Sequence, residues 1–270
     1  AAGMAMRGFR PVAEIMFGDF LTLAADQIIN TAAKFPLMYR GKVSVPMVLR
    51  TPMGGGRGYG PTHSQSIEKH FLGVPGLTVV SPSVAHEAGG LLEQAVLGGT
   101  QPTLFVEYKN LYATRRLEST NNLHVRTAPG SGVWPTMVVE NFDKGRPDVV
   151  VLAYGGPTAL VVRVMNDLAR EEIRVRSVFP ALISAPLDEA AFRDELPNGI
   201  PLLVAEESTA GFTWGSEIVA SLFEGATRRT DRRVRRLTSG ADVVPAAEKL
   251  ESEMLLTEQK LSRAILELLQ

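Results

Sequence analysis

His63 is the residue of this chain best placed for chemistry, because it closely follows a loop, 54–60, in which five of seven residues are glycine. An imidazole titrates near neutral pH and can both accept and donate a proton. Glycines permit positive φ angles and let backbone or ligand approach closely, at an entropic cost in the unfolded chain. The combination indicates a ligand-binding loop that presents a histidine. The plainer alternative is a surface turn whose backbone hydrogen-bonds the imidazole.

The loop does not fit the common nucleotide-binding patterns. A dinucleotide fingerprint, G-x-G-x-x-G, would need glycine at Tyr59 or Pro61. A Walker loop would need lysine directly after Gly60, where this chain has proline. A Ser-His-Asp triad is also disfavoured. Ser64 and Ser66 are close neighbours of His63 in sequence, and such neighbours rarely have the geometry of a triad. No G-x-S-x-G elbow is present.

Two aromatic residues, Phe17 and Phe20, flank a strand-to-helix junction and are candidate ligand contacts, although core packing would explain such a pair as simply. The other histidines are expected to be surface or hydrogen-bonded residues: His70, His86 and His124. No two histidines have the i, i+4 spacing of a helical metal site, and H-E-x-x-H is absent. The chain has no cysteine. We therefore expect neither a metal site, a disulfide nor thiolate catalysis.

Charge and hydropathy narrow the possible partners. The formal net charge is -1, so nothing draws the whole molecule to nucleic acid or to an anionic membrane. One basic cluster, 228–236, contains no aromatic residue to stack on a base and is interpreted as a solvated turn and strand edge. No apolar run reaches the length of about 18 residues that suggests a membrane span. We expect a cytoplasmic, bacterial-type protein with no nucleic-acid or membrane partner.

Strands and helices alternate along the chain, which predicts an α/β fold with parallel sheets covered by helices on both faces. The first series has expected strands at 11–17, 43–49, 77–81 and 103–106 and expected helices at 1–7, 19–34 and 83–97. A further helix is expected directly after the glycine loop. Asp19 is the expected N-cap of the helix at 19–34, and Ser64 or Ser66 that of the helix after the loop. The second series has expected strands at 148–152, 175–179, 202–205 and 234–237, a turn at Pro186–Asp188, and helices at 158–170, 216–222 and 248–269.

The stretch 113–147 shows neither periodicity and carries several turn signals, so we place a linker there. This divides the chain into a first α/β domain at 1–112 and a second at 148–270. At 270 residues the chain is long enough for two such domains.

Three runs of sequence closely resemble the β subunit of the thiamine-diphosphate-dependent E1 component of 2-oxo acid dehydrogenase complexes, of the pyruvate, branched-chain 2-oxo acid and acetoin dehydrogenase type. They are EIMFGDFLTLAADQIINTAAK (14–34), RTPMGGGRGYGPTHSQSIEKHFLGVPGLTVVSPS (50–83) and PTLFVEYKNLY (102–112). Shorter runs after residue 148, such as LLVAEES, are similar to the C-terminal domain of transketolase. The resemblance implies a pyrimidine-binding domain at 1–112, N-terminally truncated, and a transketolase C-terminal-like domain at 148–270.

The resemblance also implies a function and a site. A β subunit of this type supplies the pyrimidine side of the cofactor pocket, while the α subunit holds the diphosphate and Mg²⁺. Phe20 matches the aromatic residue that packs on the aminopyrimidine ring, with Phe17 beside it, and His63, in the HSQS motif, matches the histidine of proton and acyl transfer. The implied partners are an α subunit in an α2β2 heterotetramer, a lipoyl-E2 acyltransferase and a small 2-oxo acid.

Two departures from the family pattern keep alternatives open. The family's thiamine-activating glutamate would fall before Ala1, and Glu14 matches a different position, so we expect the chain to begin inside an element. Residues 98–101 lack the Asp and Asn that relatives carry near a structural potassium ion, so such a site is in doubt. The alternative functions are a split transketolase-like acyl or ketol transferase and a non-catalytic structural subunit.

Overall fold

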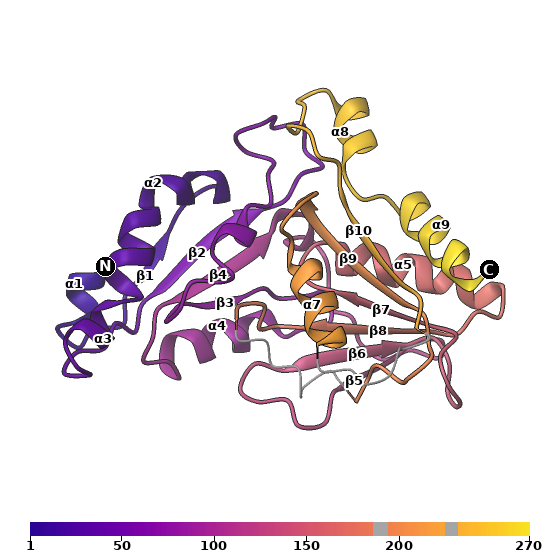
Figure 1. Cartoon of the computed structure of the whole chain (residues 1–270), viewed down its shortest axis with the longest axis horizontal. Helices are drawn as coiled ribbons and strands as arrows, with labels where there is room; N and C mark the ends of the chain where they lie inside the picture. Colours follow the sequence, from indigo (N-terminus) through magenta and orange to yellow (C-terminus); the bar gives the residue numbers. More distant parts are fainter. Residues whose placement is uncertain (186–193, 225–231) are drawn as a thin grey trace.

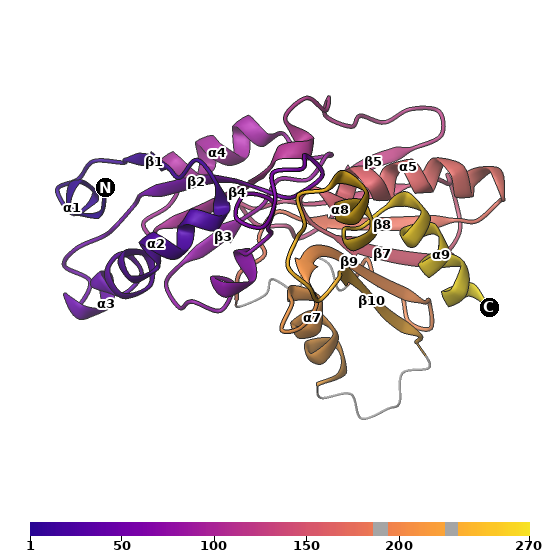
Figure 2. The same cartoon turned by 90° about the horizontal axis from the view of Figure 1, so that it is seen from above.

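The computed structural model describes residues 1–185, 194–224 and 232–270, which form two sheets set side by side (Figure 1, Figure 2). The first sheet has the strand order β1-β2-β4-β3, and the second has the order β10-β9-β7-β8-β6-β5. The expected two-part α/β fold is confirmed. The expected turn at Pro186–Asp188 and residues 228–231 of the basic cluster lie outside the described residues.

The first sheet is parallel throughout and is covered on both faces. Along β4, Leu104 and Val106 point into a core shared with the helical segment that follows β1, while Phe105 points to the other face, against Leu91 of α4. The strands are β1 (Val12–Glu14), β2 (Val48–Met53), β3 (Thr78–Val80) and β4 (Thr103–Tyr108). The α-helices are α1 (Ala2–Ala5), α2 (Leu21–Asp26), α3 (Phe35–Met38) and α4 (Ala88–Leu97), with 3₁₀ turns at Gly18–Phe20, Glu68–His70 and Lys109–Leu111 and a π-helical turn at Gln27–Ala32.

The second sheet is parallel except for β6, which lies next to one edge and pairs antiparallel with both β8 and the edge strand β5. Its central strand β7 is buried on both faces, which explains its unbroken apolar sequence. Helices α5 and α9 cover one face and α7 the other. The strands are β5 (His124–Thr127), β6 (Thr136–Glu140), β7 (Val149–Ala153), β8 (Val175–Pro180), β9 (Leu202–Thr209) and β10 (Val234–Ser239), and the helices are α5 (Pro157–Arg170), α7 (Trp214–Phe223), α8 (Glu248–Met254) and α9 (Glu258–Leu269).

Several expected elements differ in the structure. Residues 113–147 contain β5 and β6, both of which belong to the second sheet, so this stretch is not simply a linker. The helix expected at 83–97 begins at Ala88, because the Glu87 side chain accepts from the amides of Gly89 and Gly90. The helix expected at 248–269 is two helices, since Leu255 and Leu256 are buried between them and Thr257 caps α9.

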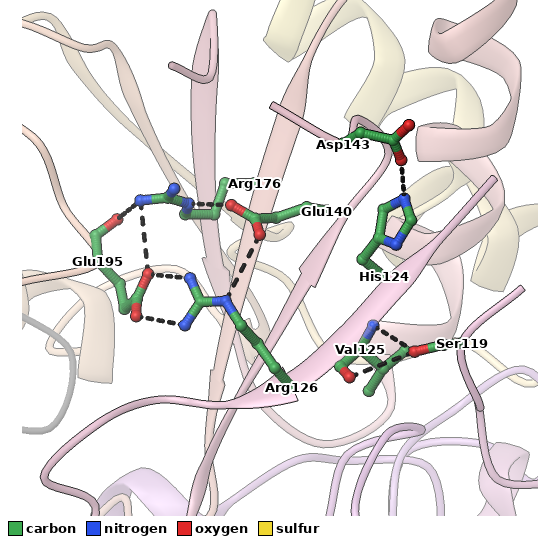
Figure 3. A network of polar contacts seen from close by, with 8 residues as sticks. All are labelled: Ser119, His124, Val125, Arg126, Glu140, Asp143, Arg176 and Glu195. Atoms are coloured by element: carbon green, nitrogen blue, oxygen red, sulfur yellow. Dashed lines mark hydrogen bonds and ion pairs between the residues drawn. The ribbon is translucent and has the colours of Figure 1, made fainter. Parts of the chain in front are cut away.

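Strands β5, β6 and β8 are linked by a network of four charged side chains (Figure 3). Arg126 donates from both guanidinium Nη atoms to the Glu195 carboxylate, at 2.6 Å each. Arg176 donates to Glu140 at 2.7 Å and lies 3.4 Å from Glu195. Positive and negative side chains therefore alternate from β5 to β6 to β8, and opposite charges on neighbouring strands stabilise their pairing. These ion pairs favour the observed register of β5 and β6, the two strands that the sequence did not predict.

His86 is buried, as a satisfied histidine would be, but it lies in the turn before α4 and not on a helix. Its Nδ1 accepts from the amide of Ser83 at 2.9 Å, and its Nε2 lies 2.9 Å from the carbonyl oxygen of Pro135. Burial outweighs the bond to that carbonyl and lowers the pKa of His86 from 6.5 to about 4.

The lowered pKa of His86 predicts a pH dependence of stability. As pH falls below about 6.5 the unfolded chain takes up a proton at this histidine before the folded chain does, so the free energy of unfolding should fall between about pH 6.5 and about pH 4. Urea unfolding midpoints across this range should decline less steeply for His86→Gln than for the unchanged protein. The exposed His70 provides the control, since His70→Gln should leave the decline unchanged.

Candidate active site

The glycine loop leaves the carboxyl end of β2 and turns by placing alternate residues in the left-handed region. Gly54, Gly56, Gly58 and Gly60 have φ of +93°, +82°, +67° and +78°. A Cβ at Gly54 would stand 2.9 Å from a ring carbon of Tyr108, so the close approach as well as the backbone angle requires glycine there. The carboxyl end of parallel strands is the edge where α/β proteins bind ligands.

The segment after the loop is not the helix that the sequence predicted. Ser64 and Ser66 are buried and cap nothing; Ser66 instead donates to the carboxylate of Glu207. Only a short 3₁₀ turn, Glu68–His70, follows. The polar pattern that resembles a helix start therefore reflects buried contacts with the second half of the chain.

His63, Phe17 and Phe20 form an aromatic cluster. The His63 ring centroid lies 4.3 Å from that of Phe17 and 5.3 Å from that of Phe20, both in edge-to-face geometry. All three side chains are half-buried, so part of the cluster faces solvent. Nδ1 of His63 lies 2.9 Å from the hydroxyl of Thr62. Among the described residues no partner hydrogen-bonds Nε2, which leaves that nitrogen able to exchange a proton with a ligand.

Asp19 ties the aromatic turn to the histidine segment. Its carboxylate accepts from the Gln65 side-chain amide at 2.7 Å. The sequence predicted this aspartate as the N-cap of a helix, but its side chain caps no helix, and the helical segment begins with a 3₁₀ turn at Gly18. The bond joins two segments that are 46 residues apart along the chain, and it holds Phe17 and Phe20 against His63.

Lys109 lies directly beneath the cluster and was not singled out by sequence reasoning. It is only 5% exposed, donates to the carbonyl oxygen of His63 at 2.6 Å, and its ammonium lies 5.6 Å from the ring centroid of Phe17. Burial, the largest cause, and the charge of Arg57 lower the pKa of Lys109, against the opposing effect of nearby carboxylates. A lysine immediately after the carboxyl end of the buried strand β4 was the available signal.

The amides of the loop are not arranged to bind a phosphate. Gly55 donates to the Glu207 carboxylate, while Gly56 and Gly58 donate to that of Glu251. Within residues 1–185, 194–224 and 232–270 no group of three His, Asp or Glu side chains is placed to hold a metal ion. In the same residues no helix is long and apolar enough to cross a membrane.

Two family models match this chain: transketolase, pyrimidine binding domain, over residues 1–115, and transketolase, C-terminal domain, over residues 140–261. The chain is 31% identical to acetoin:2,6-dichlorophenolindophenol oxidoreductase subunit beta of Bacillus subtilis, covering 100% of this chain and 75% of that protein. It is 32% identical to 2-oxoisovalerate dehydrogenase subunit beta of the same organism, covering 98% and 78%. The chain belongs to the E1 β-subunit family. It is also 31% identical to pyruvate dehydrogenase E1 component subunit beta of Leifsonia xyli, covering 93% and 71%.

Solved structures share the fold of this E1 β-type chain. A split gene transketolase, described as an inactive beta4 tetramer, aligns with a TM-score of 0.69 at 19% identity and covers 100% of this chain and 79% of that one. A transketolase from Pichia stipitis aligns with a TM-score of 0.63 over 96% of this chain and 34% of that one.

The aromatic cluster of this E1 β-type chain fits the heteroaromatic end of thiamine diphosphate, the cofactor of the family. Phe17 and Phe20 offer half-buried ring surface beside a histidine with an open nitrogen. The occupied loop amides do not fit the diphosphate end. The aromatic cluster therefore suits the heteroaromatic half of the cofactor.

Proposed function

We propose that this chain is the β subunit of a 2-oxo acid dehydrogenase E1 component. With an α subunit it carries out the thiamine-diphosphate-dependent oxidative decarboxylation of a 2-oxo acid and passes the acyl group to a lipoyl-E2. Family membership supports the reaction class. The observation that supports the site is the contact of the His63 ring with Phe17 and Phe20.

We assign roles within the proposed site from its geometry. Phe20, with Phe17 beside it, packs on the aminopyrimidine ring. His63 moves a proton at Nε2, since Nδ1 is engaged by Thr62. Lys109 holds the backbone of His63 in place. The bound cofactor supplies the electron sink for decarboxylation.

The remaining parts of the proposed assembly come from other chains. The α subunit holds the diphosphate and its Mg²⁺, in an α2β2 heterotetramer located in the cytoplasm. The absence of an acidic cluster in the described residues and the occupied loop amides support this division. A lipoyl domain approaches the solvent-facing side of the aromatic cluster.

Reconstitution tests this proposal. The chain, combined with an E1 α subunit, thiamine diphosphate and Mg²⁺, should reduce 2,6-dichlorophenolindophenol with pyruvate or 2-oxoisovalerate, and neither chain alone should do so. Ketol transfer to an aldehyde without any 2-oxo acid oxidation would identify a split transketolase-like enzyme instead. Assembly without either activity would identify a structural subunit.

A further inference from the structure

The glycine loop is enclosed by the C-terminal part of the chain, residues 246–255, almost 200 positions away in sequence. Figure 1 shows α8 standing beside the loop that follows β2, and Figure 2 shows the same contact from above. A Cβ at Gly55 would meet Cδ1 of Leu255 at 2.5 Å, and one at Gly60 would meet Cβ of Ala246 at 3.2 Å. The density of glycine is therefore needed for this packing as well as for the turn.

One carboxylate binds the middle of the loop. Glu251, on α8, is 1% exposed; its Oε1 accepts from the amide of Gly56 at 3.0 Å and its Oε2 from that of Gly58 at 2.9 Å. A second carboxylate, Glu207 at the end of β9, accepts from the amide of Gly55 at 2.8 Å. Hydrogen bonds to an ionised acceptor are about twice as strong as neutral ones. Because both glutamates belong to the second half of the chain, they join its two halves at the loop.

The loop in turn sets the position of His63. The amide of His63 donates to the carbonyl oxygen of Gly60 at 3.3 Å, and the amide of Gly54 donates to that of Gln65 at 3.3 Å. The histidine is therefore attached to the loop at its end and across its base.

The loop has only two side chains of its own that make contacts outside it: Tyr59, whose ring centroid lies 6.2 Å from that of Phe17, and Arg57, which donates to the carbonyl oxygen of Lys109 at 3.0 Å. Because its glycines pack no side chains, the order of the loop depends largely on the carboxylates that bind its amides.

We propose that Glu251 is a positioning residue, which orders the glycine loop from α8 and thereby holds His63 against Phe17 and Phe20. Its effect on catalysis rests on the proposed function, whereas its effect on the loop does not. This gives residues 246–255 a part in the active site. Glu207 supports the same loop from β9.

Glu251→Gln is the informative variant, because it keeps the shape of the side chain and replaces one acceptor oxygen by an NH₂ group that faces a backbone N–H. Glu248→Gln is the matched control, since Glu248 lies on the same helix and is exposed. Hydrogen–deuterium exchange of residues 54–60 in the full-length chain should be on the order of tenfold faster in Glu251→Gln than in Glu248→Gln. Trypsin should also cut more quickly after the exposed Arg57. Equal exchange and equal cleavage in the two variants would overturn the proposal.

The reconstituted enzyme supplies the second measurement. Glu251→Gln should lower kcat about tenfold with little change in KM, because a shifted histidine affects the chemical step more than substrate binding. Glu251→Asp, which keeps the carboxylate, should recover part of both loop protection and kcat. If Glu251→Gln does not fold, Glu251→Asp is compared with Glu248→Gln in its place. A faster-exchanging loop with unchanged kcat would refute the positioning role. If the unchanged enzyme proved inactive, the proposed function would fail, and loop exchange alone would still decide whether Glu251 orders the loop.

Discussion

Replacing His63 by alanine should lower the rate of acyl transfer to a lipoyl acceptor by on the order of a hundredfold or more, the usual loss when a positioned acid–base group is removed. The open Nε2, the contact with two aromatic rings and the restraint of its carbonyl by Lys109 are the structural basis for this expectation. The rate should be measured with the reconstituted α and β subunits.

The exposed His70 offers a control seven residues away, and His70→Ala should retain the normal rate. Thiamine diphosphate should still bind to the His63→Ala enzyme, because Phe17 and Phe20 remain in place to contact its ring. Undiminished acyl transfer by His63→Ala would remove His63 from the mechanism and would leave the aromatic cluster as a binding surface alone.

The alternation of strands and helices was sufficient to predict most of the fold. It placed β7, α5 and β8 to within one or two residues, because a fully apolar strand followed by a long amphipathic helix is a strong periodic signal. The elements it missed are of a different kind. Strands β5 and β6 are short, lie at a sheet edge and carry charged residues such as Arg126 and Glu140, whose pairing is visible only in the folded sheet.

The candidate site was predictable where its functional residues lie next to each other in the sequence, as the glycine loop and His63 do. Phe17 and Phe20 were candidate ligand contacts from the sequence, the resemblance to E1 β subunits gave them an expected role, and the structure brings all three rings together. Whether these residues bind cofactor and move protons stays a prediction.

Other site residues could not be found from sequence because long-range contacts define them. Glu207 and Glu251 reach the loop from more than 150 residues away, and nothing in their local sequence indicates that they bind its amides. The same limit explains the misplaced helix after the loop. Ser66 looks like a helix cap until its acceptor on β9 is known.

Replacing Glu68 by alanine should reduce the free energy of unfolding by about 3 kcal/mol or more, because it removes one acceptor shared by several buried donors. Glu68 is fully buried, and its Oε1 accepts from the hydroxyls of Tyr108 at 2.8 Å, Tyr154 at 2.6 Å and Ser208 at 3.3 Å. These donors come from both sheets, so the carboxylate links the two halves beneath the glycine loop. Urea unfolding midpoints would measure the loss.

Two opposing effects decide the size of the change at Glu68. Removing a buried carboxylate relieves its desolvation cost, which can make the loss of a buried charge neutral or even stabilising when well-packed apolar groups replace it. Here the two tyrosine hydroxyls would keep no acceptor, and the deleted side chain would leave a cavity, so the penalties should exceed the relief. Burial and the charge of Glu68 raise the pKa of both tyrosines well above the usual range, so both remain donors at every ordinary pH.

Glu68→Gln retains an acceptor oxygen in the same shape and should reduce the free energy of unfolding by only about 1 kcal/mol. Tyr154→Phe, which removes a single donor, should reduce it by a similar amount. An alanine variant as stable as the glutamine variant would mean that desolvation of the carboxylate, and not its hydrogen bonds, dominates the energetics of this cluster.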